Sequence, residues 1–224
     1  MSPCSLRRRR GDAPRAAPDA KEPIACRLAG ALAPTCTTGA LAFLGAMVWR
    51  AKGEPLGWDE PGRAALVTLM GTSPPLGAWS ALGDARLLGL VCAIATLVGL
   101  AGGRARAGVI VWCAGLAALS SSFFLKAMLD RPRPPGACEA GASFPSTHAA
   151  MAAAVWLTLA LAATRGSPRL RAPIVAGAFC AAFMAAAAGV ASGRHWPSDA
   201  LGGVLLGVAV AGLAARAIDR QPRP

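Results

Sequence analysis

The sequence predicts an all-α polytopic membrane protein, a bundle of about six transmembrane helices. Hydrophobic residues make up 54% of the 224 residues and charged residues only 15%, whereas a soluble domain usually carries about 25% charged residues. The apolar residues also cluster in blocks of about 17–22, the length that crosses a hydrocarbon core about 30 Å thick. The alternative is a soluble Ala-rich helical protein, but soluble helices need a polar face and Ala172–Val190 has no charged residue.

Apolar blocks at six places in the chain are the candidate membrane spans. They are Leu28–Trp49, Leu87–Gly103, Ala107–Met128, Thr147–Ala163, Ala172–Val190 and Leu201–Ala215. Ala and Gly are frequent in them, and small side chains let membrane helices approach closely. We expect a compact bundle in which the short connections Gly102–Arg106 and Arg165–Arg171 make neighbouring helices antiparallel.

The remaining segments are polar or only weakly apolar. Residues 1–24 are rich in Arg, Pro and Ala, which predicts a disordered basic cytoplasmic tail. Residues 25–218 then form a single six-span membrane domain, followed by a cytoplasmic tail at 219–224. The connection Arg50–Arg86 has apolar stretches too short to span a bilayer, so we expect one or two interfacial helices there.

The formal net charge of +12 is explained by topology. If the N-terminus is cytoplasmic, 15 of the 23 Lys and Arg residues fall on the cytoplasmic side of six spans, as the positive-inside rule requires. The charge therefore predicts a multi-pass cell-membrane protein with both termini in the cytoplasm. Anionic lipid head groups are a natural partner, and nucleic acid is not.

Ionisable residues near membrane depth are costly and mark functional sites. The two histidines of the chain, His148 and His195, fall in the two outer connections that also carry charged residues. In the first, Lys126 ends a span and Arg133 follows it, which would place a point charge and a planar fork near a bound phosphate. The alternative for these cations is snorkelling at the end of a span.

The start of the fourth block carries a second pattern. Ser146 is a good N-cap, and the free backbone N–H groups of the first turn, at Thr147 and His148, would form an anion site. The alternative is a simple cap beside an interfacial histidine.

The third pattern precedes the sixth block. Asp199 follows His195 by four residues, so its carboxylate could accept a proton from one ring nitrogen and leave the other free to attack. The alternative is that Asp199 only favours the helix start electrostatically.

Together these patterns resemble the motifs of the type 2 phosphatidic acid phosphatase superfamily, K-x6-R-P, P-S-G-H and S-R-x5-H-x3-D. The matching residues are Lys126 with Arg133-Pro134, then Pro145-Ser146-Thr147-His148, then His195 with Asp199. The resemblance extends from the second apolar block to the C-terminus. It implies a membrane lipid phosphatase with an extracytoplasmic active site, acting on a lipid phosphate or a polyprenyl diphosphate.

The resemblance also implies a role for each matching residue. His195 would be the nucleophile that forms a phosphohistidine, Asp199 would orient it, and His148 would protonate the leaving group and later activate water. The phosphoryl oxygens would be held by Lys126, Arg133, Ser146 and the Thr147 backbone N–H. Because these donors supply the charge stabilisation, no metal or other cofactor is expected. The seven cysteines contain no C-x-x-C pair and suggest no zinc site.

The chain departs from the motifs at two positions. Thr147 replaces a Gly, and Gly189, preceded by Ala188, stands where the third motif has Arg preceded by Ser. Loss of one charge-stabilising donor typically costs on the order of 10²–10³ in rate, and Arg194 is the nearest possible substitute. A catalytically weak or inactive member that binds lipid phosphates or acts as a scaffold is therefore the alternative to an enzyme. A transporter or channel lacks support, since no paired broken helices are apparent, and the oligomeric state stays open.

Overall fold

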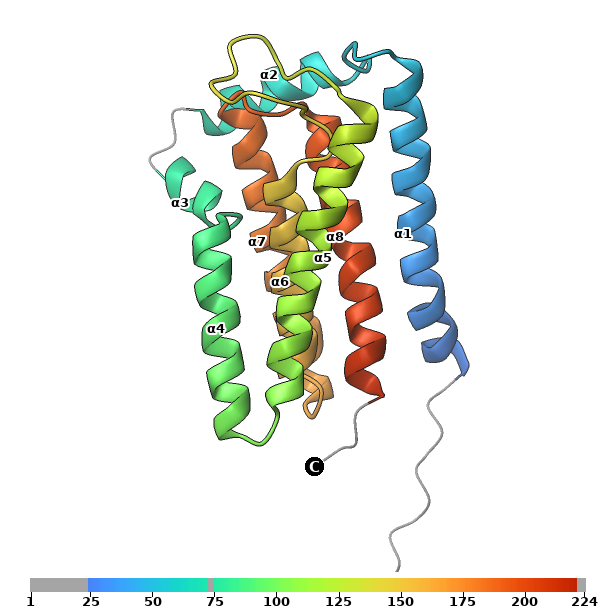
Figure 1. The fold of residues 1–224 in the computed structure, drawn as a ribbon, viewed down its shortest axis with the longest axis vertical. Coiled ribbons are helices and arrows are strands. Elements are labelled where there is room, and N and C mark those ends of the chain that lie inside the picture. The colour runs from blue at the N-terminus through green and yellow to red at the C-terminus, as the bar shows by residue number, and fades with distance from the viewer. Residues whose placement is uncertain (1–23, 72–74, 221–224) are drawn as a thin grey trace, which may run out of the picture.

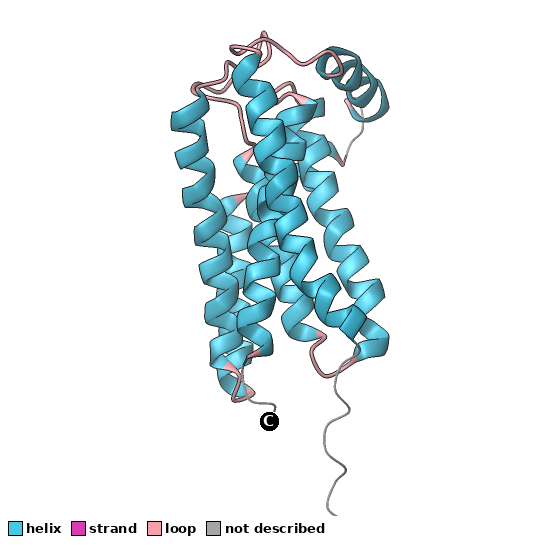
Figure 2. Ribbon diagram, turned by 90° about the vertical axis from the view of Figure 1, so that its right-hand side faces the viewer, coloured by secondary structure: helices cyan, strands magenta, loops and turns pink. Residues whose placement is uncertain are grey.

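The computed structural model describes residues 24–71 and 75–220, which fold into helices joined by short loops (Figure 1). The helices are α1 (Ile24–Arg50), α2 (Asp59–Met70), α3 (Leu76–Ala81), α4 (Ala85–Ala101), α5 (Ala105–Leu129), α6 (Thr147–Ala163), α7 (Pro168–Ala191) and α8 (Pro197–Asp219). Within these described ranges there is no strand (Figure 2). The predicted all-α class is confirmed. The predicted basic tail up to residue 23, and residues 221–224, lie outside the described residues.

The long helices α1 and α4–α8 stand side by side along the long axis of the molecule (Figures 1 and 2). Each overlaps one of the predicted apolar blocks, and α6 coincides with its block, Thr147–Ala163. By length and composition α5, α7 and α8 can cross a membrane, and α4 and α6 are shorter apolar helices of 17 residues each. The structure therefore has the predicted polytopic bundle.

Two short helices occupy the long connection between α1 and α4. The first, α2, lies across the upper end of the bundle in Figure 1 and begins with Asp59 and Glu60, where acidic side chains interact favourably with the helix dipole. The second, α3, leads into α4. The expected one or two helices are present in this connection, and their position at the membrane interface stays a prediction.

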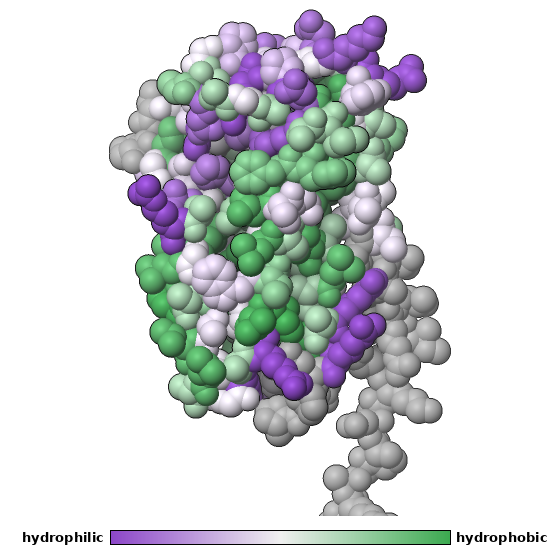
Figure 3. Space-filling view, viewed as in Figure 1, coloured by the Kyte–Doolittle hydropathy of each residue, from purple (hydrophilic) through white to green (hydrophobic). Residues whose placement is uncertain are grey.

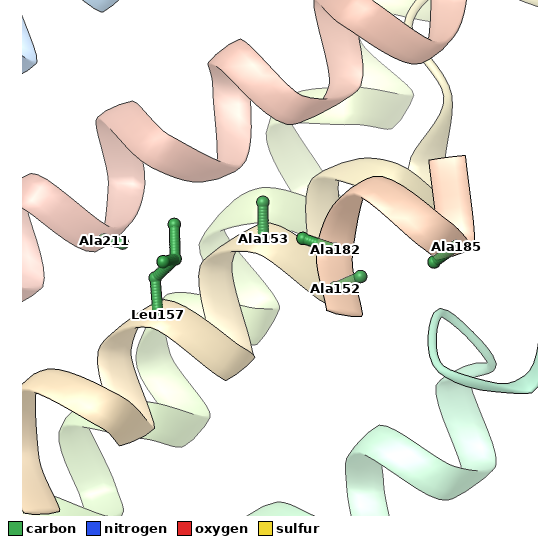
Figure 4. Packing of buried hydrophobic residues seen from close by; sticks show 6 residues of the cluster. All are labelled: Ala152, Ala153, Leu157, Ala182, Ala185 and Ala211. Atoms are coloured by element: carbon green, nitrogen blue, oxygen red, sulfur yellow. The ribbon is translucent and has the colours of Figure 1, made fainter. Parts of the chain in front are cut away.

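Helix α6 is the centre of the bundle and packs against α4, α5, α7 and α8. Its contact faces are made of small residues. In Figure 4, Ala152, Ala153 and Leu157 of α6 lie against alanines of α7 and α8, namely Ala182, Ala185 and Ala211. Such small faces allow close packing of membrane helices, so α6, which begins at the second motif, packs closely against the helices that carry Lys126 and Asp199.

Glycines bring α6 and α8 into backbone contact. A Cβ on Gly207 would lie 2.5 Å from the Cβ of Ala153 and would also clash with the carbonyl oxygen of Ala150. A Cβ on Gly203 would meet the carbonyl oxygen of Ser146 in the same way. Only glycine fits at these two positions, where the first half of α8 packs directly against the first half of α6.

The surface of the bundle is apolar around its middle. Figure 3 shows hydrophobic residues over the centre of the visible face and hydrophilic ones gathered towards its two ends. Large side chains such as Leu97, Val98, Phe124 and Leu213 are 58–67% exposed. Apolar exposure on this scale indicates a lipid-facing surface rather than a soluble one, and the chain is a membrane protein.

Candidate active site

The two outer connections of the motifs converge at the upper end of the bundle, beside α2 (Figure 1). A cavity of about 620 Å³ lies there. Its polar lining includes Lys126, Arg133, Glu139, Thr147, His148 and His195. Its apolar lining includes Leu119, Phe123 and Met151 of α5 and α6. Both histidines of the chain thus face one space together with two of the predicted cations.

His195 lies in the loop between α7 and α8 and is 3% exposed. Its Nδ1 is 3.7 Å from Oδ2 of Asp199, a distance in ion-pair range but too long for a hydrogen bond. The Nδ1 atom has no hydrogen-bond partner. Burial lowers the pKa of the His195 imidazole below its ordinary value, and the Asp199 carboxylate partly offsets that effect. His195 is therefore neutral near pH 7, the state in which a ring nitrogen can attack.

Asp199 also shapes the start of α8. Its Oδ2 accepts a hydrogen bond from the backbone N–H of the N-cap residue Trp196 at 2.8 Å. The carboxylate thus supports the start of α8 and lies 3.7 Å from the His195 ring, while the predicted hydrogen bond to that ring stays a prediction. The helix start consequently fixes the position of Asp199 relative to His195.

The second motif lies at the start of α6. Ser146 is the N-cap, as predicted, with its Oγ accepting from the N–H of Ala149 at 3.5 Å. It is 1% exposed and does not line the cavity, whereas Thr147 and His148 do. The Thr147 hydroxyl lies 2.9 Å from Oγ of Ser122 on α5. This contact accommodates a branched side chain at the position where the motif has glycine.

The two cations of the first motif hold the loop that covers the cavity. Nζ of Lys126 donates to the carbonyl oxygens of Ala142 at 2.6 Å and Ser143 at 3.1 Å. Arg133 donates from Nε to the carbonyl of Gly141 at 3.2 Å and from Nη1 to that of Arg194 at 2.9 Å. Both side chains line the cavity, so they can still offer positive charge to a bound anion.

Glu139 is a residue of the site that sequence reasoning missed. One carboxylate oxygen lies 2.9 Å from Nη1 of Arg133 and the other 3.5 Å from Nη1 of Arg194. Partial burial raises the pKa of Glu139, but the guanidinium groups of Arg133 and Arg194 outweigh it and hold the pKa below its usual value. No motif marks this position. In the present conformation Glu139 is the anion between the two arginines.

Arg194 does not line the cavity. Its Nη2 donates to Oγ of Ser80 at 2.6 Å and its Nε to Oγ of Ser192 at 2.9 Å. Gly189, where the motif has arginine, lies instead directly beside His195: a Cβ added to it would be 3.6 Å from Cδ2 of that ring. Arg194 is thus directed towards α3, and it reaches the site through Glu139.

Behind His195 lies a second pair of residues that sequence reasoning did not single out. Arg131 and Asp59 are fully buried. Arg131 bridges the carboxylates of Asp59 and Asp199 at 2.7 Å each. Within the described ranges, no group of three or more His, Cys, Asp and Glu side chains is placed to hold a metal ion.

The fold and site together define a helical membrane protein with a cationic, two-histidine pocket at one end of its bundle. The model of the PAP2 superfamily matches residues 106–223, more than half of the chain, and the chain belongs to this superfamily. The resemblance inferred from the three motifs is thereby confirmed. No curated protein matches the sequence significantly.

Two solved structures are similar to this chain. The first is the transmembrane PAP2-type phosphatidylglycerolphosphate phosphatase from Bacillus subtilis, with a TM-score of 0.73 and 20% sequence identity, covering 85% of this chain and 98% of that one. The second is LpxE from Aquifex aeolicus, with a TM-score of 0.56 and 20% identity, covering 72% of this chain and 96% of that one. At this identity the likeness establishes the fold.

Proposed function

We propose that the chain is an integral membrane lipid phosphatase that hydrolyses phosphate monoester or diphosphate head groups through a phosphohistidine intermediate. The observation that carries the proposal is that His148 and His195 line one cavity with Lys126 and Arg133. Membership in the PAP2 superfamily supports a phosphatase. Enzymes catalyse phosphoryl transfer mainly by positioning the reactants and stabilising negative charge. A site for this reaction therefore needs a nucleophile, an acid and fixed cations.

In the first step, the free ring nitrogen of His195 attacks phosphorus and forms an N–P bond while the bond from phosphorus to the leaving oxygen breaks. His148, protonated, gives its proton to that oxygen. In the second step, water attacks phosphorus, His148 takes the proton from the water, and the N–P bond breaks. Inorganic phosphate leaves and His195 is neutral again. Throughout, Lys126, Arg133 and the backbone N–H of Thr147 stabilise the phosphoryl oxygens, while Asp199 orients His195.

The walls of the cavity support a lipid substrate. Leu119, Phe123 and Met151 form an apolar side towards the middle of the bundle, and Phe123 is 60% exposed on the outer surface. An acyl or prenyl chain can therefore extend along the helices while its phosphate reaches the histidines. Phosphatidic acid, phosphatidylglycerol phosphate and polyprenyl diphosphates all have this form.

The site is proposed to face the extracytoplasmic side of the cell membrane, with both chain termini in the cytoplasm. The starting end of α1 and the final end of α8 lie together, opposite the cavity (Figure 1). The excess of Lys and Arg in the segments of that end favours a cytoplasmic location. Thiol labelling of intact cells tests this orientation, because Cys138, in the loop that covers the cavity, is exposed.

Phosphate release from a panel of lipid phosphates and polyprenyl diphosphates, with and without a chelator, tests the activity. We expect release that survives chelation and is abolished in His195→Ala. After rapid quenching, ³²P transferred from a labelled lipid should be found on the wild-type protein and be absent from His195→Ala. Cys138→Ser, a change at an exposed free thiol, is the matched control. Full activity of His195→Ala would contradict the proposal.

The second candidate is a catalytically weak or inactive family member that binds lipid phosphates. It is favoured by Gly189, which leaves the position beside His195 without its arginine. Survival of His148, His195 and Asp199 in one site argues against it, since a binding protein needs no nucleophile and acid. Retention of lipid-phosphate vesicles by wild-type protein that releases no phosphate would support this candidate.

A further inference from the structure

A buried ion network connects α2 to the loop after α5 and to the start of α8. Its charged members are Asp59, Arg131 and Asp199, all with 0% exposure. Asp59 lies outside the stretch 106–223 that matches the superfamily model. Arg131 contacts the motif residue Asp199 at 2.7 Å, and Asp199 lies 3.7 Å from the ring of the proposed nucleophile His195.

Asp59 is the residue that anchors the network. Its Oδ2 accepts from Nη2 of Arg131 at 2.7 Å, from Oγ of Ser198 at 2.8 Å and from the N–H of Leu56 at 2.9 Å. Its Oδ1 accepts from the N–H of Ser198 at 2.9 Å. Four donors from three parts of the chain thus fix this carboxylate, and two of them belong to the first turn of α8.

Arg131 carries the constraint from Asp59 to Asp199. Its Nη1 donates to Oδ1 of Asp199 at 2.7 Å and to Oγ of Ser198 at 2.6 Å, and its guanidinium lies 5.9 Å from the centre of the Trp196 ring. Oδ1 of Asp199 is thereby held by Arg131 and Oδ2 by the Trp196 N–H, so the carboxylate cannot rotate away from His195. Hydrogen bonds between charged partners are roughly twice as strong as neutral ones.

The charges of the network matter as much as its geometry. Two carboxylates and one guanidinium leave one net negative charge beside His195. The other charged or titratable groups that face His195 are Lys126 and Arg133, whose charges disfavour an imidazolium. Glu139 and His148 also line the cavity, and Arg194 directly precedes His195 in the sequence. The network therefore supplies a negative charge that offsets the cations and stabilises positive charge on His195.

We propose that Asp59 and Arg131 are positioning residues: Asp59 fixes Arg131, Arg131 fixes the Asp199 carboxylate, and the net negative charge stabilises the cationic ring that forms when His195 bonds to phosphorus. This inference rests on the proposed function for its catalytic consequence. Its electrostatic part, the control of His195 by Asp59, holds whatever the substrate.

The electrostatic part is tested by the titration of His195 in full-length protein. The chain has only two histidines, so NMR of histidine-labelled protein in detergent micelles gives two imidazole titrations, and His148→Ala assigns them. In Asp59→Asn the network becomes neutral, and the pKa of His195 should fall by on the order of one pH unit. Glu60→Gln, at the exposed neighbouring position, should leave it unchanged. An unchanged His195 titration in Asp59→Asn would overturn the charge argument.

The positioning part is tested by kinetics. In Asp59→Asn, kcat for phosphate release should fall on the order of 10- to 100-fold at little change in KM, and the acid limb of kcat/KM should move to lower pH. A role limited to holding the fold would lower the unfolding temperature but leave kcat per folded molecule and the pH profile unchanged. That result would overturn the proposal.

A second variant keeps the test open if Asp59→Asn does not fold. Ser198→Ala removes the hydroxyl that donates to Asp59 and accepts from Arg131 but keeps every charge. We expect kcat to fall about three- to tenfold with the His195 titration unchanged, and an unchanged kcat would count against positioning. Wild-type protein without phosphate release would contradict the proposed function, while the His195 titration would still decide the electrostatic link.

Discussion

Gly189 lies against the ring of His195: a Cβ at position 189 would be 3.6 Å from Cδ2 of the imidazole, an ordinary van der Waals distance. The position that carries an arginine in the third motif is therefore buried next to the proposed nucleophile and free of steric obstruction at its first atom. Arg194, the nearest cation in sequence, is directed to Ser80 and Ser192. The first side-chain atom of an arginine at position 189 would therefore lie in ordinary contact with His195.

Gly189→Arg should raise phosphate release. Removing one donor that stabilises a developing oxyanion costs about 10²–10³ in rate, so restoring one should yield about tenfold or more. The measurement is kcat on the preferred lipid phosphate. Gly189→Met, which adds similar length without charge, should give no gain. An equal gain in both variants would attribute the effect to packing, and no gain in either would mean that another group already fills the role.

Glu139 should compete with the substrate phosphate for Arg133, which lines the cavity. Glu139→Gln keeps the shape of the side chain but removes its charge, leaving the guanidinium group of Arg133 available to the phosphoryl oxygens. Partly exposed ion pairs are worth about 0.2–1 kcal/mol each, so KM should fall about two- to fivefold with kcat nearly unchanged. Inhibition by inorganic phosphate should strengthen in parallel. A higher KM in this variant would instead mean that Glu139 helps to bind the substrate.

The sequence predicted the positions of the long helices correctly, but it predicted the residues at which they begin less accurately. The sixth apolar block begins at Leu201, but α8 begins at Pro197, because Pro and the capping Asp199 form a polar first turn that hydropathy does not detect. Likewise α7 starts at Pro168, before its apolar block. In α6 the N-cap Ser146 directly precedes the apolar residues, so both signals coincide and the predicted start is correct.

The motif residues could be found in the sequence because they resemble the spaced motifs of a known family, whereas their partners depend on the tertiary fold. Arg131 and Arg133 are alike in sequence, and only the fold separates a buried ion-pair arginine from one that lines the cavity. Asp59 reaches Ser198 across 139 positions of sequence. Nothing local to such a residue reveals that distant contact, so the supporting network could not be read from the chain.

The acid limb of the pH profile should lie below the ordinary histidine value. The nucleophile must be neutral, since a protonated ring has no free lone pair. Burial lowers the pKa of His195 from its ordinary 6.5, and Asp199 offsets only part of that. The limb in kcat/KM, which reports the free enzyme, should thus have its midpoint below pH 6.5, so activity persists as the pH falls through that value. A midpoint above pH 6.5 would contradict a buried neutral nucleophile.

The contact of α8 with α6 should limit the stability of the bundle. Gly207→Val places a side chain against the carbonyl oxygen of Ala150 and 2.5 Å from the Cβ of Ala153, and neither backbone can retreat without separating the two helices. Overpacking of this kind costs about 1–3 kcal/mol. We expect a lower unfolding temperature in detergent and a loss of phosphate release, because α6 carries His148 and α8 carries Asp199. Gly177→Val on α7, where a Cβ would have no neighbour within 4 Å, is the matched control, and equal destabilisation of both variants would contradict close packing at Gly207.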